Sequence, residues 1–243
     1  MSVGGLHTPA GVAGAPAGAG GVGDAGRWQV RRLAGPAGTL HHRPWPRPVV
    51  CSVSFLTADR PALVLGSTQP ETVADPDRLA TAGVELVRRR SGGGAVLLHP
   101  GSVVWADVMV PAGDGLWCTD VGRAFLWLGR VWAEALAAVG VDGAAVHTGP
   151  LVRSEWSDLV CFAGLGPGEI TLDGRKVVGM SQRRTREGAL FQCAALLRWD
   201  VDRLAGLLGL DASAAAELAG VATGLDVAAP VLEQALVDAL AAS

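Results

Sequence analysis

Short apolar runs rich in valine and leucine alternate with Gly, Pro and charged residues through the first half of the chain. Runs of this length bounded in this way are typical of strands, because a helix shows a longer periodic pattern. They occur at residues 49–56, 62–66, 84–87, 95–98 and 103–110. We therefore expect this half of the chain to build sheet.

The pattern then changes to a helical period. Thr119 stands where an N-cap residue belongs, and Gly140 supplies a C-terminal stop. Between them, apolar residues recur at the spacing that places them on one helix face. These residues are Val121, Phe125, Leu128, Trp132, Ala135 and Val139. The pattern predicts one long amphipathic helix after the first strands.

A β-hairpin is predicted around Asp173-Gly174, because this pair tolerates the positive φ angles of a type I′ turn. Its strands would be residues 169–172 and 175–180, and another strand-like stretch covers residues 189–199. The C-terminal remainder carries leucines at helical spacing and predicts two or three short helices. Strands and helices do not alternate regularly, so we expect an α+β fold without repeated βαβ units.

The length of 243 residues allows one substantial core, so we expect a single catalytic domain over residues 27–243. Residues 1–26 are dominated by Gly and Ala, lack the pattern of a targeting signal, and predict a disordered tail. The net charge of -3 gives no reason to expect nucleic acid. Every apolar stretch is broken well before the roughly 20 residues that cross a bilayer, so we expect a cytoplasmic protein. The four cysteines lack Cys-x-x-Cys spacing, which disfavours disulfides and a zinc site.

The first chemically informative segment is residues 88–96, Arg-Arg-Arg-Ser-Gly-Gly-Gly-Ala-Val, between two predicted strands. Consecutive glycines let the backbone approach a ligand closely, and their N–H groups can converge on an anion. The arginines add positive charge for a phosphate or carboxylate. A solvated hairpin would have the same composition. The segment does not match the P-loop pattern, because no Gly-Lys-Ser/Thr follows.

The second segment is residues 173–184, Asp-Gly-Arg-Lys-Val-Val-Gly-Met-Ser-Gln-Arg-Arg. In the predicted hairpin Lys176 would project from the face opposite to Val177, and Gly179 permits a bend or close packing beyond it. A lysine placed in this way would be able to contact an acyl carbonyl or a phosphate. The alternative is an ordinary exposed strand lysine.

Taken together, the two segments resemble the lipoate-protein ligase and octanoyltransferase branch of the biotin/lipoate ligase superfamily. Residues 88–96 match its Arg-Arg-x-Ser-Gly-Gly-Gly-x-Val motif, and residues 174–181 match its Gly-Lys/Arg-Lys-x-x-Gly-x-Ser/Ala motif. Residues 65–69, Leu-Gly-Ser-Thr-Gln, look like its early Gly-x-x-Gln segment. The resemblance covers residues 62–199 and implies an α+β catalytic domain with a mixed sheet flanked by helices.

For a ligase, the resemblance implies that ATP with Mg²⁺ activates lipoate as an acyl-adenylate, which a lysine of a lipoyl carrier domain then attacks. Such carriers include 2-oxoacid dehydrogenase subunits and the glycine cleavage H protein. Lys176 would stabilise charge developing at the carbonyl and the α-phosphate. The residues expected to bind substrate and nucleotide are Arg89, Ser91, Gly92, Gly93, Gly94, Ala95, Gly179 and Ser181.

Cys161 supports a rival mechanism. In one group of octanoyltransferases, a Cys-Phe pair precedes the hairpin lysine by the interval that separates Cys161-Phe162 from Lys176 here. The resemblance then implies an acyl-enzyme on Cys161 that takes octanoate from an octanoyl-carrier protein without any cofactor. The alternative for Cys161 is a buried loop thiol.

Three departures from the family pattern affect the choice between these mechanisms. His99 comes one residue later than the usual ligase histidine, which on a strand turns it to the other face. Gln192-Cys193 replaces the ligases' His-Gly pair, and Ser102 replaces an Asn. About 40 residues follow Trp199, too few for the accessory domain of many ligases, so for a ligase of this kind we expect a separate accessory polypeptide. A third alternative is a non-catalytic relative that binds an acyl group or a nucleotide.

Overall fold

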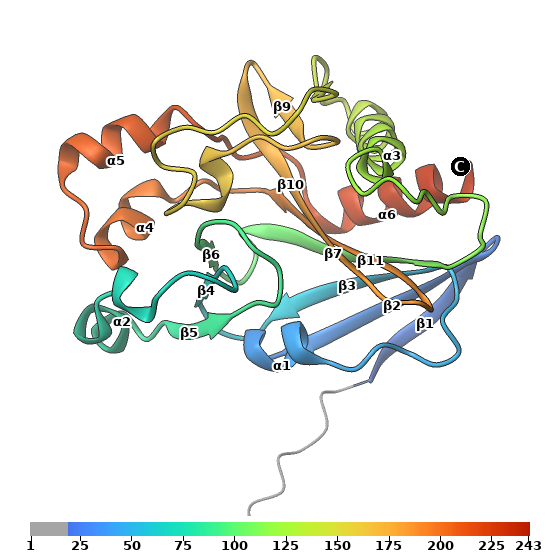
Figure 1. Cartoon of the computed structure of the whole chain (residues 1–243), viewed down its shortest axis with the longest axis horizontal. Coiled ribbons are helices and arrows are strands. Elements are labelled where there is room, and N and C mark those ends of the chain that lie inside the picture. The colour runs from blue at the N-terminus through green and yellow to red at the C-terminus, as the bar shows by residue number, and fades with distance from the viewer. Residues whose placement is uncertain (1–18) are drawn as a thin grey trace, which may run out of the picture.

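The computed structural model describes residues 19–243, and its main feature is a mixed sheet of eight strands (Figure 1). Strands β2 and β3 are parallel, and all the other neighbours are antiparallel. In spatial order the strands are β1 (Ala19–Ala25), β2 (Trp28–Gly35), β3 (Ser52–Ala58), β7 (Val103–Pro111), β11 (Gly188–Leu196), β10 (Arg175–Arg184), β9 (Ile170–Leu172) and β8 (Ala145–Val146).

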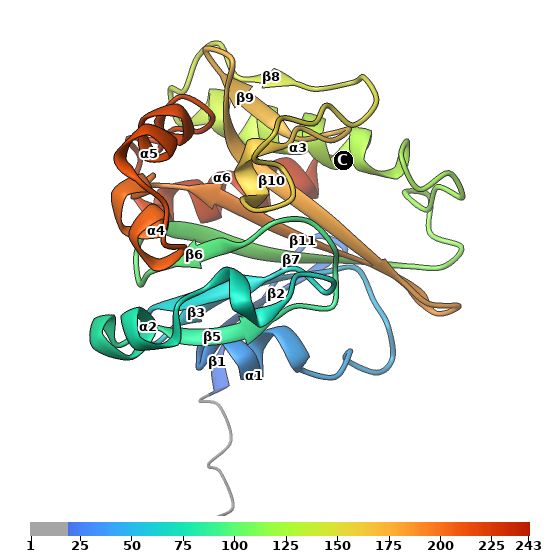
Figure 2. The same ribbon diagram turned by 60° about the vertical axis from the view of Figure 1, so that its left-hand side comes forward.

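A smaller sheet of three strands lies beside the large one (Figure 2). Its central strand β4 (Ala62–Leu65) is parallel to β5 (Glu85–Arg88) and antiparallel to β6 (Val96–Leu98). Helix α2 (Pro76–Ala82) forms the crossover from β4 to β5 and begins at Asp75, whose side chain accepts two backbone N–H bonds. The loop from β5 to β6 carries the three consecutive glycines.

Helices α3 (Ala124–Ala138) and α6 (Ala229–Ala241) cover one face of the large sheet (Figure 1). Side chains of β7 alternate between the two faces, as in any strand. Val104 and Val108 belong to the core beneath α3 and α6, where Trp132 is fully buried. Trp105 belongs to a second apolar cluster on the opposite face, with Leu98 and Phe162.

The remaining helices pack around the smaller sheet. They are α1 (Ala37–His42), α4 (Val201–Leu207) and α5 (Ala212–Ala219). Leu204 of α4 and Leu218 of α5 form a third apolar cluster with Leu63 and Val160. Two 3-10 turns, η1 (Glu71–Val73) and η2 (Cys161–Ala163), interrupt the loops. The second of them lies directly after Val160, so this cluster supports the segment that carries Cys161.

The sequence predicted most of this architecture, and the α+β fold with its mixed sheet is confirmed. A strand overlaps each predicted run, and the C-terminal remainder forms α4, α5 and α6. The hairpin is also confirmed, because Asp173 and Gly174 have φ angles of 50° and 76°. No helix among residues 19–243 has the length and apolarity needed to cross a membrane.

Two predictions need correction. The long helix begins at Ala124, and the side chain of Asp120 accepts the N–H of Arg123, so Thr119 is not its cap. Gly122 in the intervening turn disfavours an earlier start. Residues 19–25 of the predicted tail form β1, since backbone pairing with β2 needs no large side chains. Residues 1–18 of the predicted tail lie outside the described residues.

Candidate active site

A cavity of about 400 Å³ opens between the glycine-rich loop of the smaller sheet and strands β10 and β11 of the large one. Both sequence motifs reach it, although they are far apart in the chain. The predicted site residues that line it are Arg89, Gly92, Gly93, Gly94, Cys161, Lys176, Gly179 and Ser181. Val96, Leu98, Trp105 and Phe162 also line it, so much of its wall is apolar and suits an acyl chain.

The glycine-rich loop touches the Cys161 turn through its backbone. A Cβ atom on Gly94 would lie 2.5 Å from backbone atoms of Val160, a distance that real Cβ atoms do not show. The N–H of Ala95 donates to Leu159 O at 2.7 Å, and the N–H of Cys161 donates to Ala95 O at 2.9 Å. The missing side chain at position 94 therefore lets the loop hold Cys161 against the cavity.

We expect Gly94→Ala to destabilise the protein by about 1–3 kcal/mol, because the added methyl group collides with backbone that cannot move aside. The acyl transfer that the sequence resemblance implies should fall as well, since the Cys161 turn is displaced. Gly92→Ala is the matched control, because a Cβ atom there meets nothing within 4 Å. Urea denaturation and a transfer assay would measure both effects. Equal stability and activity in the two variants would contradict this account of the loop.

Arg89 is buried, and its side chain holds the glycine-rich loop in place through hydrogen bonds. Its guanidinium donates to Gly92 O at 2.7 Å and to Gly94 O at 2.9 Å, and its Nε donates to Ser91 Oγ at 3.1 Å. One of the same nitrogens also lies 3.7 Å from Cys161 Sγ. Arg89 therefore places a fixed positive charge beside the thiol.

Two of the residues expected to bind substrate do not line the cavity. Ser91 serves as an acceptor for Arg89, and Ala95 is fully buried in a backbone bridge to Val160. Both residues therefore stabilise the loop without lining the cavity. His99 is also away from the cavity, in a small separate pocket where Nδ1 lies 3.1 Å from Pro100 O.

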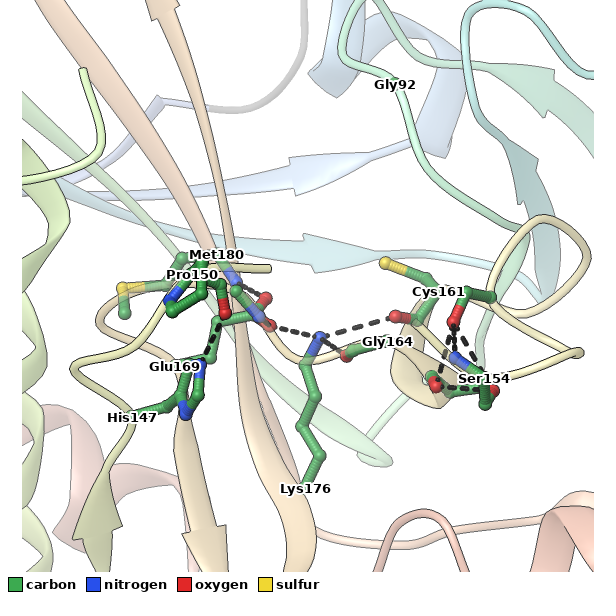
Figure 3. Close-up of polar contacts among 12 residues, drawn as sticks. Gly92, His147, Pro150, Ser154, Cys161, Gly164, Glu169, Lys176 and Met180 are labelled. Atoms are coloured by element: carbon green, nitrogen blue, oxygen red, sulfur yellow. Dashed lines mark hydrogen bonds and ion pairs between the residues drawn. The ribbon is translucent and has the colours of Figure 1, made fainter. Parts of the chain in front are cut away.

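Lys176 is buried, so it is not an ordinary exposed strand lysine. Its side chain faces the cavity, while Val177 packs into the core on the opposite face, as the hairpin predicted. Nζ forms an ion pair with Glu169 at 2.7 Å, and both side chains are less than a tenth exposed, at 4% and 8%. Nζ also donates to Gly164 O at 2.9 Å and to Cys161 O at 3.3 Å. Figure 3 shows the lysine between Glu169 and the turn that carries Cys161.

Gly179 makes room for this lysine. A Cβ atom on Gly179 would lie 3.2 Å from Lys176 Cε and 3.4 Å from Phe162 Cζ, closer than ordinary contact. The ring of Phe162 lies 5.1 Å from Nζ and adds a cation–π contact. The second motif therefore supplies both the cation and the space in which the cation is held.

Cys161 and Cys193 both line the cavity, and their surroundings differ. Burial raises the pKa of the Cys193 thiol far above its usual range, so it stays protonated and inert at neutral pH. Cys161 is partly exposed and faces the cavity, with the Arg89 guanidinium beside it. Of these two thiols, Cys161 is therefore the one suited to act as a nucleophile.

The sequence prediction missed Glu169 and His41 as cavity residues. Glu169 immediately precedes β9, the strand that pairs with the one carrying Lys176, and opposite charges on the two arms of the predicted hairpin were the available signal. His41 lies in α1, which no periodic pattern indicated. Its ring stacks on Trp105 with 4.3 Å between centroids, and no described residue hydrogen-bonds to its buried ring nitrogens.

Burial, followed by the positive charge of Arg89, lowers the pKa of His41 to about 3. The unfolded chain binds this proton near pH 6.5, so the folded state loses stability as the pH falls below that value. We expect a loss of about 2 kcal/mol between pH 6.5 and pH 5 from this residue alone. His41→Phe keeps a ring on Trp105 and should remove that part of the slope. Urea midpoints across this pH range would test it, and identical slopes for the two proteins would refute the assignment.

Residues 47–235 match the family described as the lipoyl protein ligase A/B catalytic domain. The chain belongs to this family. The resemblance drawn from the two motifs is thus confirmed, and all the residues that line the cavity except His41 lie within the matched range.

Among relatives of this family, octanoyltransferase LipM of Carboxydothermus hydrogenoformans is 32% identical over 156 residues, covering 62% of this chain and 54% of the relative. The enzyme of the same name from Moorella thermoacetica is 30% identical over 178 residues, 72% of this chain and 63% of the relative. The chain therefore spans less than two thirds of the length of these curated relatives.

The fold is that of lipoate-protein ligases of known structure. Lipoate-protein ligase A bound with ATP superposes with a TM-score of 0.65 at 19% identity, covering 89% of this chain and 84% of the other. A bipartite lipoate protein ligase from Thermoplasma acidophilum gives 0.66 at 17% identity, covering 89% and 82%. At these identities the likeness establishes the fold alone.

Proposed function

We propose that this protein is an octanoyltransferase that carries the acyl group on Cys161 and delivers it to a lysine of a lipoyl carrier domain. The observation that supports this most strongly is the position of Cys161. Its thiol lines the cavity beside the Arg89 guanidinium, and Lys176 donates a hydrogen bond to the carbonyl oxygen of the same residue. The curated relatives named above are octanoyltransferases, which supports the same choice.

In the first step, the Cys161 thiolate attacks the carbonyl carbon of an octanoyl thioester on a carrier protein. A new C–S bond forms to Cys161, the old C–S bond breaks, and the carrier sulfur leaves as a thiol after taking up the proton that Cys161 lost. In the second step, the amine of the acceptor lysine attacks the acyl-enzyme. The C–N bond of the amide forms, the C–S bond to Cys161 breaks, the sulfur takes up the proton lost by the amine, and no ATP is consumed.

Lys176 is proposed to act in both steps. Each step passes through a tetrahedral intermediate with negative charge on the former carbonyl oxygen, and a fixed cation lowers the energy of that charge. Arg89 holds positive charge beside the sulfur, where a thiolate must form. The apolar wall that includes Val96, Leu98 and Trp105 would bind the hydrocarbon chain.

An ATP-dependent lipoate ligase is the second candidate, because the loop of Gly92, Gly93 and Gly94 lines the cavity and suits an adenylate. The carboxylates fit this candidate less well. Among the described residues that line the cavity, the carboxylates are Asp158 and Glu169. Lys176 and two backbone N–H groups occupy both oxygens of Glu169, which leaves for Mg²⁺ with a nucleotide only the exposed Asp158, itself paired with Arg153 through one oxygen. We therefore place the transferase first, ahead of the ligase favoured by the sequence motifs.

Intact-mass analysis tests the proposal. The protein would be incubated with octanoyl-carrier protein and, in a separate arm, with ATP, Mg²⁺ and lipoate, each with and without an apo lipoyl domain. An octanoyl adduct on the enzyme, followed by octanoylation of the domain without ATP, is the expected result. Modification of the domain only in the ATP arm would establish the ligase. No transfer in either arm would leave the non-catalytic relative or a missing accessory polypeptide, and adding candidate accessory chains would separate these two.

A further inference from the structure

Lys176 is the only lysine among the 243 residues, whereas the other 19 residues of the Lys and Arg total are arginines. The two side chains differ in a way that matters at a buried site. Lysine ends in a compact nitrogen with three N–H donors, whereas arginine carries its donors on a planar fork. The chain thus keeps a lysine at the one position where a small ammonium group meets the cavity.

The number of hydrogen-bond acceptors around Nζ equals the number of N–H donors of an ammonium group. Three oxygen acceptors lie within hydrogen-bond distance, on Glu169 at 2.7 Å, on Gly164 at 2.9 Å and on Cys161 at 3.3 Å. An ammonium group has three N–H donors and no lone pair, so all three acceptors are satisfied. A neutral amine has two donors and one lone pair, and would leave one of these buried acceptors without a donor.

The carboxylate of Glu169 is itself held in place. Its Oε2 accepts the N–H of Gly166 at 2.6 Å, and its Oε1 accepts the N–H of Met180 at 2.9 Å. Two backbone bonds and burial leave the carboxylate little freedom to turn away from the lysine (Figure 3). Glu169 therefore determines where the positive charge of Lys176 lies.

The location of this lysine exposes an acyl-enzyme to a side reaction, the transfer of its acyl group to Lys176. A thioester on Cys161 would lie next to an amine, and amines attack thioesters. In such a reaction the Nζ lone pair would form a C–N bond to the acyl carbon, the C–S bond would break, and sulfur would take up the proton released by nitrogen. The octanoyl group would then remain as an amide on Lys176, and the cation would be lost.

We propose that Glu169 is a positioning residue that holds Lys176 as an ammonium, so that the lysine donates hydrogen bonds beside Cys161 and is not acylated by it. This inference rests on the proposed role of Cys161 as acyl carrier. The bond from Nζ to Cys161 O is the longest of the three, so it is the one exchanged for the substrate carbonyl. Glu169 and Gly164 keep the other two donors during that exchange.

The first test needs no activity. Labelling the protein with [¹⁵N]lysine gives one side-chain ammonium signal, because Lys176 is the only lysine in the sequence. A buried, hydrogen-bonded ammonium should give an observable signal in the parent. Glu169→Gln removes the counter-charge at nearly constant volume, and the signal should be lost through exchange. Glu155→Gln is the matched control on an exposed loop residue and should leave the signal unchanged.

The second test uses octanoyl-carrier protein. Hydroxylamine cleaves thioesters and leaves amides intact, so it should remove the whole adduct from the parent and from Glu155→Gln. In Glu169→Gln a resistant octanoyl group should accumulate on the peptide that contains Lys176. The kcat for transfer should fall about 100-fold through loss of orientation, while KM changes little. Glu169→Asp retains the charge and should recover part of the rate, and it also serves if the Gln variant does not fold.

The outcomes separate the two proposals. An unchanged ammonium signal, a fully hydroxylamine-sensitive adduct and parental kcat in Glu169→Gln would overturn the role of Glu169 while leaving the transferase intact. If the parent forms no thioester at all, the covalent transferase fails and the protection from self-acylation fails with it. In that case the ammonium signal alone decides whether Glu169 positions Lys176.

Discussion

Lys176→Ala is expected to abolish acyl transfer under either proposed mechanism. Both the octanoyltransferase and the ligase develop negative charge on the acyl carbonyl oxygen, and Lys176 is the cation proposed to stabilise that charge. Loss of one hydrogen-bond donor to a developing oxyanion lowers the rate about 100- to 1,000-fold, and loss of a full buried charge should lower it further. The measurement is single-turnover transfer to an apo lipoyl domain, with either acyl donor. Transfer at the parental rate by the folded variant would refute the assignment of the site.

The structure adds a condition to this experiment. The alanine variant leaves the Glu169 carboxylate buried without its partner, and breaking such a pair costs about 3–5 kcal/mol. Folding of the variant must therefore be checked by circular dichroism, because unfolding alone would also abolish activity. Lys176→Met combined with Glu169→Gln removes both charges and should fold better than the single variant. It should still fail to transfer. Lys176→Arg is no substitute, because a planar fork cannot meet the three acceptors around Nζ.

Cys161→Ser has the second large expected effect, and it separates the two mechanisms. In the transferase, the substitution replaces the thiolate with a hydroxyl that has no neighbouring base, so transfer from octanoyl-carrier protein should fall by several orders of magnitude. The octanoyl adduct seen by intact mass in the parent should disappear. A ligase forms its intermediate on the nucleotide, so it should barely respond to the same change.

Cys193→Ala is the matched control for this variant. Cys193 lines the same cavity, but burial raises the pKa of its thiol and keeps it protonated. We expect the control to form the adduct and to transfer the acyl group, with a small loss of stability from the missing sulfur. Loss of the adduct in the Cys193 variant and its retention in the Cys161 variant would move the nucleophile to Cys193. ATP-dependent lipoylation by both variants, with no adduct in the parent, would eliminate the covalent mechanism.

The order and spacing of local features were sufficient to predict much of the fold. The Asp173-Gly174 turn is encoded by two adjacent residues that tolerate positive φ angles, and the structure has them there. The apolar runs predicted strands for the same reason, because the pattern of a strand is visible within its own few residues. The sequence did not predict strand β1, because its pairing with β2 is made by backbone groups and a Gly- and Ala-rich segment shows no alternating hydrophobic pattern.

By itself, the sequence determined the family, the hairpin that carries Lys176, and the two motifs from which the cavity is built. Only the tertiary structure brought Arg89 to Cys161, which is 72 positions away, and showed that Ser91 and Ala95 support the loop without lining the cavity. It also revealed Glu169 as the partner of Lys176 and buried His41 against Trp105. Periodicity reports the face on which a side chain lies. The environment of that side chain depends on packing between segments distant in the chain, and this packing decides its charge, partners and reactivity.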